Sequence, residues 1–279
     1  MREINADKIT EETARLCQQA NFDLNQDLIA ALKKGEKREE TERGKNIFRQ
    51  LIKNAEIASS ERMPLCQDTG FAVVFVEVGN RVKIKGNLQE AITRGVRRGY
   101  QEGYLRKSIV ADPLTRENTN DNTPPVIHLD IVPGDSLKII VAPKGGGSEN
   151  MSRIKMLSPA AGRRGVIDFV VETVKKADAN PCPPIIVGVG LGGTFEKAAL
   201  LSKKALLRRL DDSHQDSEIA ALEDEILHKI NKLGIGPQGL GGKFTALGVK
   251  IEKFPCHIAS LPVAVNINCH ASRHKEIIL

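Results

Sequence analysis

Pro64-Leu65-Cys66-Gln67-Asp68-Thr69-Gly70 stands directly before the apolar run Phe71-Ala72-Val73-Val74-Phe75-Val76. The run predicts a strand over about 71–79, because apolar and β-branched residues that follow a proline and a glycine are typical of a buried strand. The preceding stretch puts a thiol, an amide, a carboxylate and a hydroxyl on successive residues. A strand fixes such a loop while its polar side chains stay off the hydrogen-bond ladder, so we expect a functional loop. Cys66 alone fits a buried residue, a nucleophile or a metal ligand.

The composition is that of an ordinary globular protein, with 279 residues, 41% of them hydrophobic, and no tryptophan. The net charge of +6 would suit nucleic acid, but the basic residues are scattered among acids and few aromatic residues can stack bases. We therefore expect an anionic small molecule and no nucleic acid as partner. No signal-peptide core and no membrane-spanning run is visible, which predicts a cytoplasmic protein that does not bind a membrane.

Helical periodicity dominates the start of the chain, and strands appear after it. The sequence predicts an α/β fold with a helical N-terminal lobe over 1–60 and a mixed α/β body over 61–279. The elements expected within the body are helices at about 87–106, 166–176 and 195–210, strands at about 184–189, 247–251 and 261–266, and a hairpin over 126–143. The hairpin turn would be Pro133-Gly134-Asp135, with His128 on the solvent-exposed face.

Three glycine-rich stretches interrupt these elements. The glycines after Lys144 allow backbone N–H groups to converge on a phosphate or a carboxylate, unless they form only a flexible turn. Residues 188–193 contain Gly-x-Gly-x-x-Gly between a strand and a helix, which is the dinucleotide fingerprint. The acidic strand end that this fingerprint requires is missing, so close helix packing or a second anion loop explains these glycines better. The third stretch, 234–248, indicates loops near a site or an interface.

The five cysteines are an odd and sparse set, which argues against a disulfide framework. Cys17 lies on an apolar helical face and is expected in the core. Cys66, Cys182 and Cys269 lie in predicted loops at strand ends, and prolines stand close to the first two. Their spacing disfavours a zinc ribbon or a thioredoxin site, and one interpretation is a shared iron-sulfur cluster. Most clusters take four cysteines, so a set of three would leave one iron open to substrate.

Five motifs in order resemble the class I, iron-sulfur, fumarate hydratases and L-tartrate dehydratases. These motifs are Pro-Leu-Cys-Gln-Asp-Thr-Gly at 64–70, Thr-Pro-Pro-Val-Ile-His at 123–128, Pro-Lys-Gly-Gly-Gly-Ser-Glu-Asn-Met-Ser at 143–152, Gly-Val-Gly-Leu-Gly-Gly-Thr at 188–194 and Asn-Cys-His-Ala at 268–271. The resemblance runs from about residue 10 to the end. It covers only the N-terminal half of the family, which is the alpha subunit of the two-subunit enzymes.

The resemblance implies a 4Fe-4S cluster with Cys66, Cys182 and Cys269 as ligands and its fourth iron on the substrate. Substrate contacts are implied for Gln67, Arg106 and the glycine loop at Gly146 and Gly147, and catalytic roles for Asp68 and His257. Asp68 could orient Arg106, hold a proton or form a structural ion pair, and Cys256 is expected to be structural. A beta subunit would supply further basic residues and a proton-transferring threonine, in an assembly expected to hold two chains of each kind.

The expected function is therefore that of a hydro-lyase subunit interconverting (S)-malate and fumarate, a reaction of the tricarboxylic acid cycle. L-tartrate dehydration to oxaloacetate is the alternative, because the cluster-binding half does not report the substituent at C3. Two alternatives from other classes are a nicotinamide-binding oxidoreductase and a noncatalytic partner-binding subunit. The missing acidic strand end disfavours the first, and the retained loop cysteines disfavour the second.

Overall fold

The computed structural model describes residues 2–279, and contacts between residues divide the chain into two units. The first unit comprises residues up to Asn25, Asn54–Gly146 and Arg273–Leu279, and the second comprises Gln26–Lys53 and Gly147–Ser272. This division does not follow the predicted boundary at residue 60, because the N-terminal helices pack with different sheets. A separate lobe over 1–60 therefore remains a sequence-based prediction, whereas the mixed α/β class with N-terminal helices is confirmed.

The first unit is built on the strand that follows the Cys66 loop. Its elements are β1 (Arg2–Asn5), α1 (Ala6–Phe22), β2 (Phe71–Gly79), β3 (Val82–Lys85), α4 (Leu88–Glu102), β4 (Val126–Val132), β5 (Leu137–Lys144) and β10 (Lys275–Ile278). β1 and β3 pair in parallel, and the larger sheet has the order β10-β5-β2-β4. Asn87 caps α4 by accepting the Glu90 N–H at 3.0 Å.

The hairpin predicted over 126–143 is wrong, although both of its strands exist. β2 lies between them, parallel to β4 and antiparallel to β5. β2 carries the most continuous apolar run of this sheet, so its central place buries it best. His128 is half-buried, not exposed, and stacks on Phe75 with ring centroids 5.1 Å apart.

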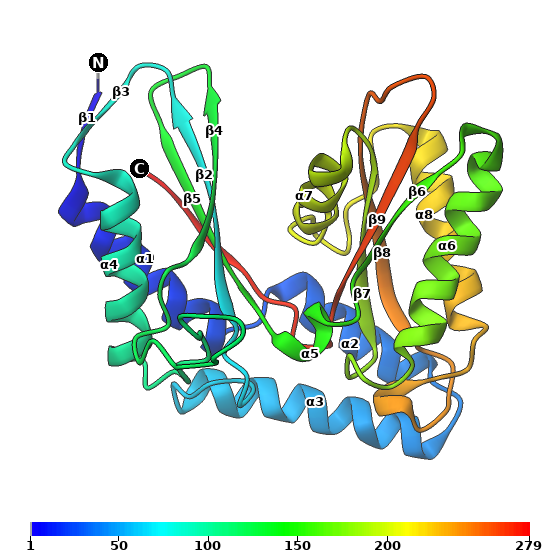
Figure 1. Cartoon of the computed structure of the whole chain (residues 1–279). Helices are drawn as coiled ribbons and strands as arrows, with labels where there is room; N and C mark the ends of the chain where they lie inside the picture. The colour runs from blue at the N-terminus through cyan, green and yellow to red at the C-terminus, as the bar shows by residue number, and fades with distance from the viewer. Residues whose placement is uncertain (1) are drawn as a thin grey trace. The chain divides into compact units, whose positions relative to one another are not determined.

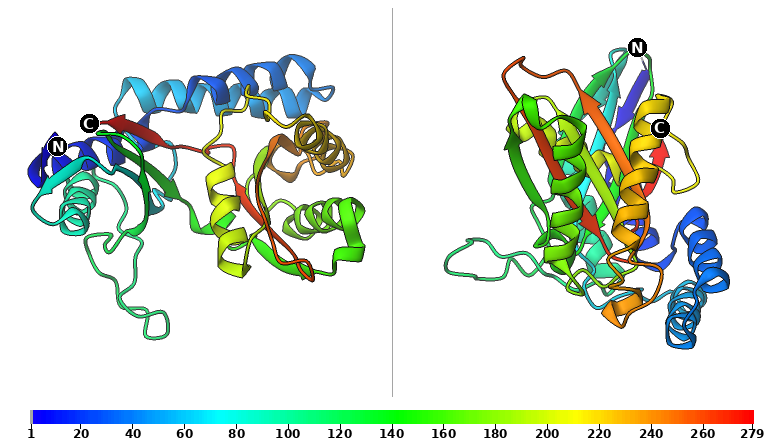
Figure 2. Two further views of the ribbon diagram at one scale, coloured as in Figure 1. Left: turned by 90° about the horizontal axis from the view of Figure 1, so that it is seen from above. Right: turned by 90° about the vertical axis from the view of Figure 1, so that its right-hand side faces the viewer.

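One face of this sheet forms the hydrophobic core of the first unit. Alternate residues of β2 and β5, such as Val74 and Ile139, pack against Leu16 of α1 and Val96 of α4. Figure 1 shows both helices along the same side of β2 and β5. The long connection between α4 and β4 extends away from these helices (Figure 2).

The second unit is a sheet covered by helices on both faces. Its elements are α2 (Gln26–Arg38), α3 (Glu42–Ser60, up to Lys53), α5 (Gly146–Glu149, from Gly147), β6 (Arg153–Leu157), η1 (Pro159–Ala161), α6 (Gly162–Ala177), β7 (Ile185–Gly192), α7 (Phe195–Ala205), α8 (Ser217–Asn231), η2 (Pro237–Gly239), β8 (Ala246–Phe254) and β9 (Leu261–Asn268). The strand order is β6-β9-β7-β8, with β7 parallel to β8 and antiparallel to β9. The predicted helix and strand positions are thus confirmed, while β6 is an addition.

The glycines of the Gly-x-Gly-x-x-Gly stretch bring a helix close to the sheet. A Cβ on Gly190 would lie 1.9 Å from the carbonyl oxygen of Ala198, and one on Gly188 would lie 2.2 Å from that of Ser202. Both carbonyls belong to α7, on the face of β7 opposite the core that α6 and α8 bury. The close packing of α7 therefore explains these glycines.

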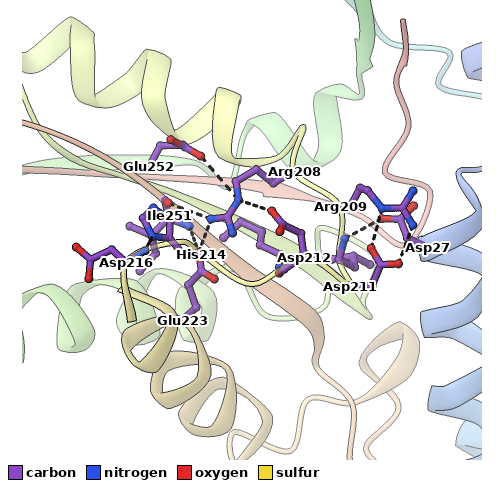
Figure 3. Close-up of polar contacts among 12 residues, drawn as sticks. Asp27, Arg208, Arg209, Asp211, Asp212, His214, Asp216, Glu223, Ile251 and Glu252 are labelled. Atoms are coloured by element: carbon purple, nitrogen blue, oxygen red, sulfur yellow. Dashed lines mark hydrogen bonds and ion pairs between the residues drawn. The ribbon is translucent and has the colours of Figure 1, made fainter. Parts of the chain in front are cut away.

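A network of charged side chains fixes the segment after α7 to strand β8 (Figure 3). Arg208 donates to the Glu223 carboxylate at 2.6 Å and to the Ile251 carbonyl at 3.2 Å, while the Ile251 N–H donates to Glu223 at 2.7 Å. Glu223 is buried, so the pairing compensates a charge that would otherwise be costly.

No helix within residues 2–279 combines the length and apolar character required to cross a membrane.

Candidate functional site

The loop that carries Cys66 is held at both ends by the first unit. The Leu65 N–H donates to the Asn21 carbonyl at 2.9 Å, and the Asn54 amide donates to the Leu65 carbonyl at 2.8 Å. The half-buried Cys66 thiol receives the Asp68 N–H at 3.4 Å and faces the Gln67 side-chain oxygen at 3.2 Å. These contacts fix the position of the Cys66 thiol, while the Gln67 side chain remains exposed.

Asp68 joins this loop to the predicted glycine loop. Its carboxylate accepts the Gly70 N–H at 3.0 Å and the Gly146 N–H at 2.7 Å. Its main-chain carbonyl accepts a hydrogen bond from the buried Arg273 guanidinium at 2.5 Å. The Gly146 N–H that was predicted to bind substrate is therefore engaged by Asp68, and sequence reasoning missed Arg273.

The main chain of Arg106 contacts the Cys66 loop, because its carbonyl accepts a hydrogen bond from the Thr69 hydroxyl at 3.0 Å. Its side chain is exposed, as expected for a group that meets a ligand from solution. Buried Tyr100 donates to the Thr69 carbonyl at 2.8 Å and the Gly70 carbonyl at 2.9 Å. Burial raises the pKa of the Tyr100 hydroxyl, which therefore stays protonated as a donor.

Cys182 and Cys269 lie together at one edge of the second sheet. Cys182 precedes β7 and Cys269 follows β9, and these antiparallel strands pair Ile186 with Asn268. The Cys182 carbonyl accepts the His270 N–H at 3.4 Å and lies 3.1 Å from His270 Nδ1. This backbone hydrogen bond joins the two cysteine loops within the unit.

Gln238 connects the same two loops and was missed by sequence reasoning. Its side-chain nitrogen donates to the Pro183 carbonyl at 2.8 Å and lies 3.2 Å from His270 Nδ1. The only sequence signal was its place in the glycine-rich stretch 234–248. Gly147, the other predicted glycine, belongs to this unit as well.

His257 lies at the other end of the second sheet. It follows β8, whose last residue pairs with Gly192 at the end of β7, whereas Cys182 precedes the beginning of β7. Eight residues of strand separate the two edges, about 25 Å at about 3.3 Å per residue. The unit therefore does not bring His257 beside its own Cys182 and Cys269.

His257 and Cys256 instead line a pocket of about 430 Å³ in the second unit. Its walls are mainly apolar and include Val166, Leu191 and Leu222. His257 is exposed, and its Nδ1 accepts the Ala259 N–H at 3.1 Å.

A second polar cluster that the sequence did not reveal fixes the segment after the glycine loop. The Asn266 amide donates to Glu149 at 2.9 Å and to the Ser152 hydroxyl at 3.0 Å, and Lys203 of α7 pairs with the same glutamate. These contacts attach α5 to β9 and α7 within the second unit.

The cysteine chemistry fits a metal-thiolate centre in type and number. None of the five cysteines forms a disulfide. Burial raises the pKa of the Cys17 thiol to about 12, which leaves it protonated and unsuited to metal. Within residues 2–279, no three Cys, His, Asp or Glu side chains are gathered as a metal site. Four thiols remain, and Cys256 follows β8 at the sheet edge opposite Cys182 and Cys269. Thiolates such as those of Cys66, Cys182 and Cys269 are the donors that iron-sulfur clusters take.

Comparison with protein families matches residues 10–278 to fumarate hydratase (fumerase). The chain belongs to the fumarate hydratase (fumerase) family. Membership agrees with the resemblance drawn from the five motifs, and the family is one of iron-sulfur hydro-lyases.

Similar proteins within the family carry another substrate in their names. A "Putative L(+)-tartrate dehydratase subunit alpha" of Methanocaldococcus jannaschii is 45% identical over 273 residues, covering 95% of each chain. The L(+)-tartrate dehydratase subunit alpha of Escherichia coli O157:H7 is 36% identical over 276 residues, covering 98% of this chain and 91% of its own. That of Escherichia coli K12 is 35% identical with the same coverage. These relatives are thus named for tartrate, whereas the matching family is named for fumarate.

Proposed function

We propose that this chain is the alpha subunit of an iron-sulfur hydro-lyase that removes water from L(+)-tartrate to give oxaloacetate. The observation that carries the proposal is the joining of the Cys182 and Cys269 loops at one sheet edge. The names of the relatives support tartrate as the substrate.

The proposed cofactor is a 4Fe-4S cluster held by Cys66, Cys182 and Cys269. When bound through three thiolates, such a cluster supplies an open iron that acts as a Lewis acid on the leaving hydroxyl. Arg273 supports the inclusion of Cys66, because it lies four residues after Cys269 in the chain and binds the Asp68 carbonyl of the Cys66 loop.

The residues around Cys66 are proposed to bind and orient the dicarboxylate. Gln67 and Arg106 offer exposed amide and guanidinium donors, which stabilise charge that builds up on a carboxylate as its neighbouring carbon loses a proton. Asp68 is proposed to fix the glycine loop, so that Gly147 presents its N–H to the substrate while Gly146 stays bound to Asp68. His257 is left out of this set because it lies at the opposite sheet edge from Cys182 and Cys269.

A beta subunit is proposed as partner, in an assembly with two chains of each kind. The relatives are named as alpha subunits, which supports a second chain that completes the enzyme. The proton-accepting group is assigned to that partner.

Interconversion of (S)-malate and fumarate is the second candidate function. It is favoured by the description of the family, fumarate hydratase. Both reactions remove a hydroxyl and a proton from adjacent carbons, so the same alpha chain serves either.

The test is anaerobic reconstitution with iron and sulfide, alone and with the beta subunit, followed by activity on both substrates. We expect cluster absorbance on the alpha chain, activity only in the pair, and a higher kcat/KM for L(+)-tartrate than for malate. Oxaloacetate is measured through NADH oxidation by malate dehydrogenase, and fumarate through its ultraviolet absorbance. A preference for malate would establish the second candidate, whereas failure to bind iron would refute both.

A further inference from the structure

The side chain of Gln238 contacts both cysteine-bearing loops of the second unit. Its amide nitrogen lies 2.8 Å from the carbonyl oxygen of Pro183, the residue after Cys182. The same nitrogen lies 3.2 Å from Nδ1 of His270, the residue after Cys269. A primary amide has two N–H groups, so one can serve each loop when Nδ1 of His270 is the unprotonated, accepting ring nitrogen.

The backbone of Gln238 also contacts the Cys182 loop. Its N–H donates to the same Pro183 carbonyl at 2.7 Å. Its φ of 53° is left-handed, which is uncommon for a residue with a Cβ and is maintained only when surrounding contacts enforce it. The side-chain amide is therefore the part that reaches beyond the Cys182 loop to the Cys269 loop.

The surrounding loop holds Gln238 firmly. The Gly239 N–H donates to the Gly236 carbonyl at 3.0 Å, and the Gly241 N–H donates to the Ile235 carbonyl at 2.9 Å. The buried Glu39 carboxylate receives the Lys243 N–H at 2.9 Å, which ties the end of the loop to helix α2 and the segment after it. These bonds orient the amide before any ligand arrives.

We propose that Gln238 is a positioning residue that fixes the spacing of the Cys182 and Cys269 thiols. The identity of the bound group rests on the proposed function, but the coupling of the two loops rests on these contacts alone. Groups beyond the direct ligands commonly orient a metal site, and their loss weakens metal binding by about 10–100-fold. Gln238 is not a ligand, so its variants should still assemble the cluster and then release it faster.

Two substitutions separate the amide from the backbone strain. Gln238→Leu keeps the left-handed backbone and removes the amide, whereas Gln238→Gly relaxes the backbone and keeps the N–H bond to Pro183. The matched control is Gln215→Leu, because Gln215 is an exposed glutamine of the same unit. The full chain with its beta subunit is reconstituted anaerobically, and cluster absorbance is followed after addition of an iron chelator.

We expect equal initial iron and sulfide in all four proteins, and cluster loss about tenfold faster in both Gln238 variants than in wild type or Gln215→Leu. Loss at the wild-type rate in both variants would overturn the inference. Faster loss in Gln238→Leu alone would also overturn it, because Gln238→Gly lacks the amide as well and its normal rate would show that the amide is not required.

Hydrogen exchange in the metal-free full chain tests the coupling without any cluster. The His270 N–H donates to the Cys182 carbonyl, so its exchange should become about tenfold faster in Gln238→Leu if the amide holds the loops together. Unchanged exchange would overturn the inference. If the wild-type protein never binds iron but Gln238→Leu still speeds the exchange of the His270 N–H, the proposed function is refuted. The positioning role of Gln238 would then still stand.

Discussion

The burial of a cysteine decides whether its thiol can bind metal, and Cys17 is an example. It is wholly buried in the first unit, and desolvation raises its pKa to about 12. Cys66, Cys182 and Cys269 lie in loops with at least partial exposure. A metal can reach these loop thiols, whereas it cannot reach the buried thiol of Cys17.

We therefore predict that Cys66→Ser, Cys182→Ser and Cys269→Ser each abolish the 4Fe-4S cluster. Cys17→Ser, Cys256→Ser and His257→Asn should keep the iron and sulfide content of wild type, since none of these side chains belongs to the proposed ligand set. The measurement is iron, sulfide and absorbance after anaerobic reconstitution. Equal iron in all six variants would exclude the ligand assignment.

Asp121 is a residue whose ionisation should be visible in the stability of the protein. Burial acts to raise its pKa, but hydrogen bonds from Thr123 and Arg97 outweigh burial and lower it to about 2. The Arg97 bond, at 2.7 Å, attaches the connection after α4 to that helix. Because the folded-state pKa is depressed, the ionised group stabilises the fold above its ordinary pKa of about 4.

Asp121→Asn should therefore lower the free energy of unfolding by a constant amount above about pH 5. The difference from wild type should shrink as pH falls from about 4 to about 2, where wild-type Asp121 also becomes neutral. Urea unfolding at a series of pH values measures this difference, with Arg97→Met as a second way to remove the ion pair. A difference that grows toward low pH would contradict the assignment.

Strand β7 and helix α7 show at the element scale how glycine determines a packing distance. The backbone of α7 occupies the positions where the Cβ atoms of residues 188 and 190 would lie. A side chain on either residue would push the helix off the sheet. The Gly-x-Gly pattern is therefore a requirement of helix-sheet packing.

Gly190→Ala should lower the free energy of unfolding by about 2 kcal/mol or more, because its Cβ would meet the Ala198 carbonyl at 1.9 Å. Gly147→Ala is the control, since the nearest atom to its Cβ is 3.9 Å away. Chemical denaturation of both variants checks the comparison. If Gly190→Ala and Gly147→Ala have equal free energies of unfolding, helix α7 can move away from strand β7 without loss of stability.

At the scale of the whole molecule, the chain crosses between its two units at four points. Residues 26–53 pack with 147–272, although a long sequence separates them. Asp27 accepts the Leu210 N–H at 2.7 Å, and the ring of Phe48 meets that of Phe244 edge-on at 5.8 Å between centroids. The second unit is therefore built from two separate segments of the chain, and part of the first unit lies between them in the sequence.

A fragment of residues 147–272 alone should fail to fold cooperatively, because it loses the partners of Phe244 and of the Lys243 N–H. A chain in which 26–53 is joined to 147–272 by a flexible linker should regain a dispersed amide NMR spectrum. A dispersed spectrum from the shorter fragment would show that this unit folds without residues 26–53.

Most helices and the longer strands could be predicted from the sequence, because local periodicity and turn residues encode them, whereas the short strands β1, β3, β6 and β10 were not predicted. The sequence also identified the loop cysteines at 66, 182 and 269 and, through its five motifs, the family. These features depend on neighbours in the chain, so they can be recognised without a fold.

Features that depend on residues far apart in sequence became visible only in the folded chain. The fold placed β2 between β4 and β5, because the strand with the longest apolar run is buried best at the centre of the sheet. It placed His257 at the sheet edge opposite Cys182 and brought Gln238 to Pro183 and His270. Strand order and side-chain contacts of this kind arise from the packing of the whole unit, which local sequence patterns do not encode.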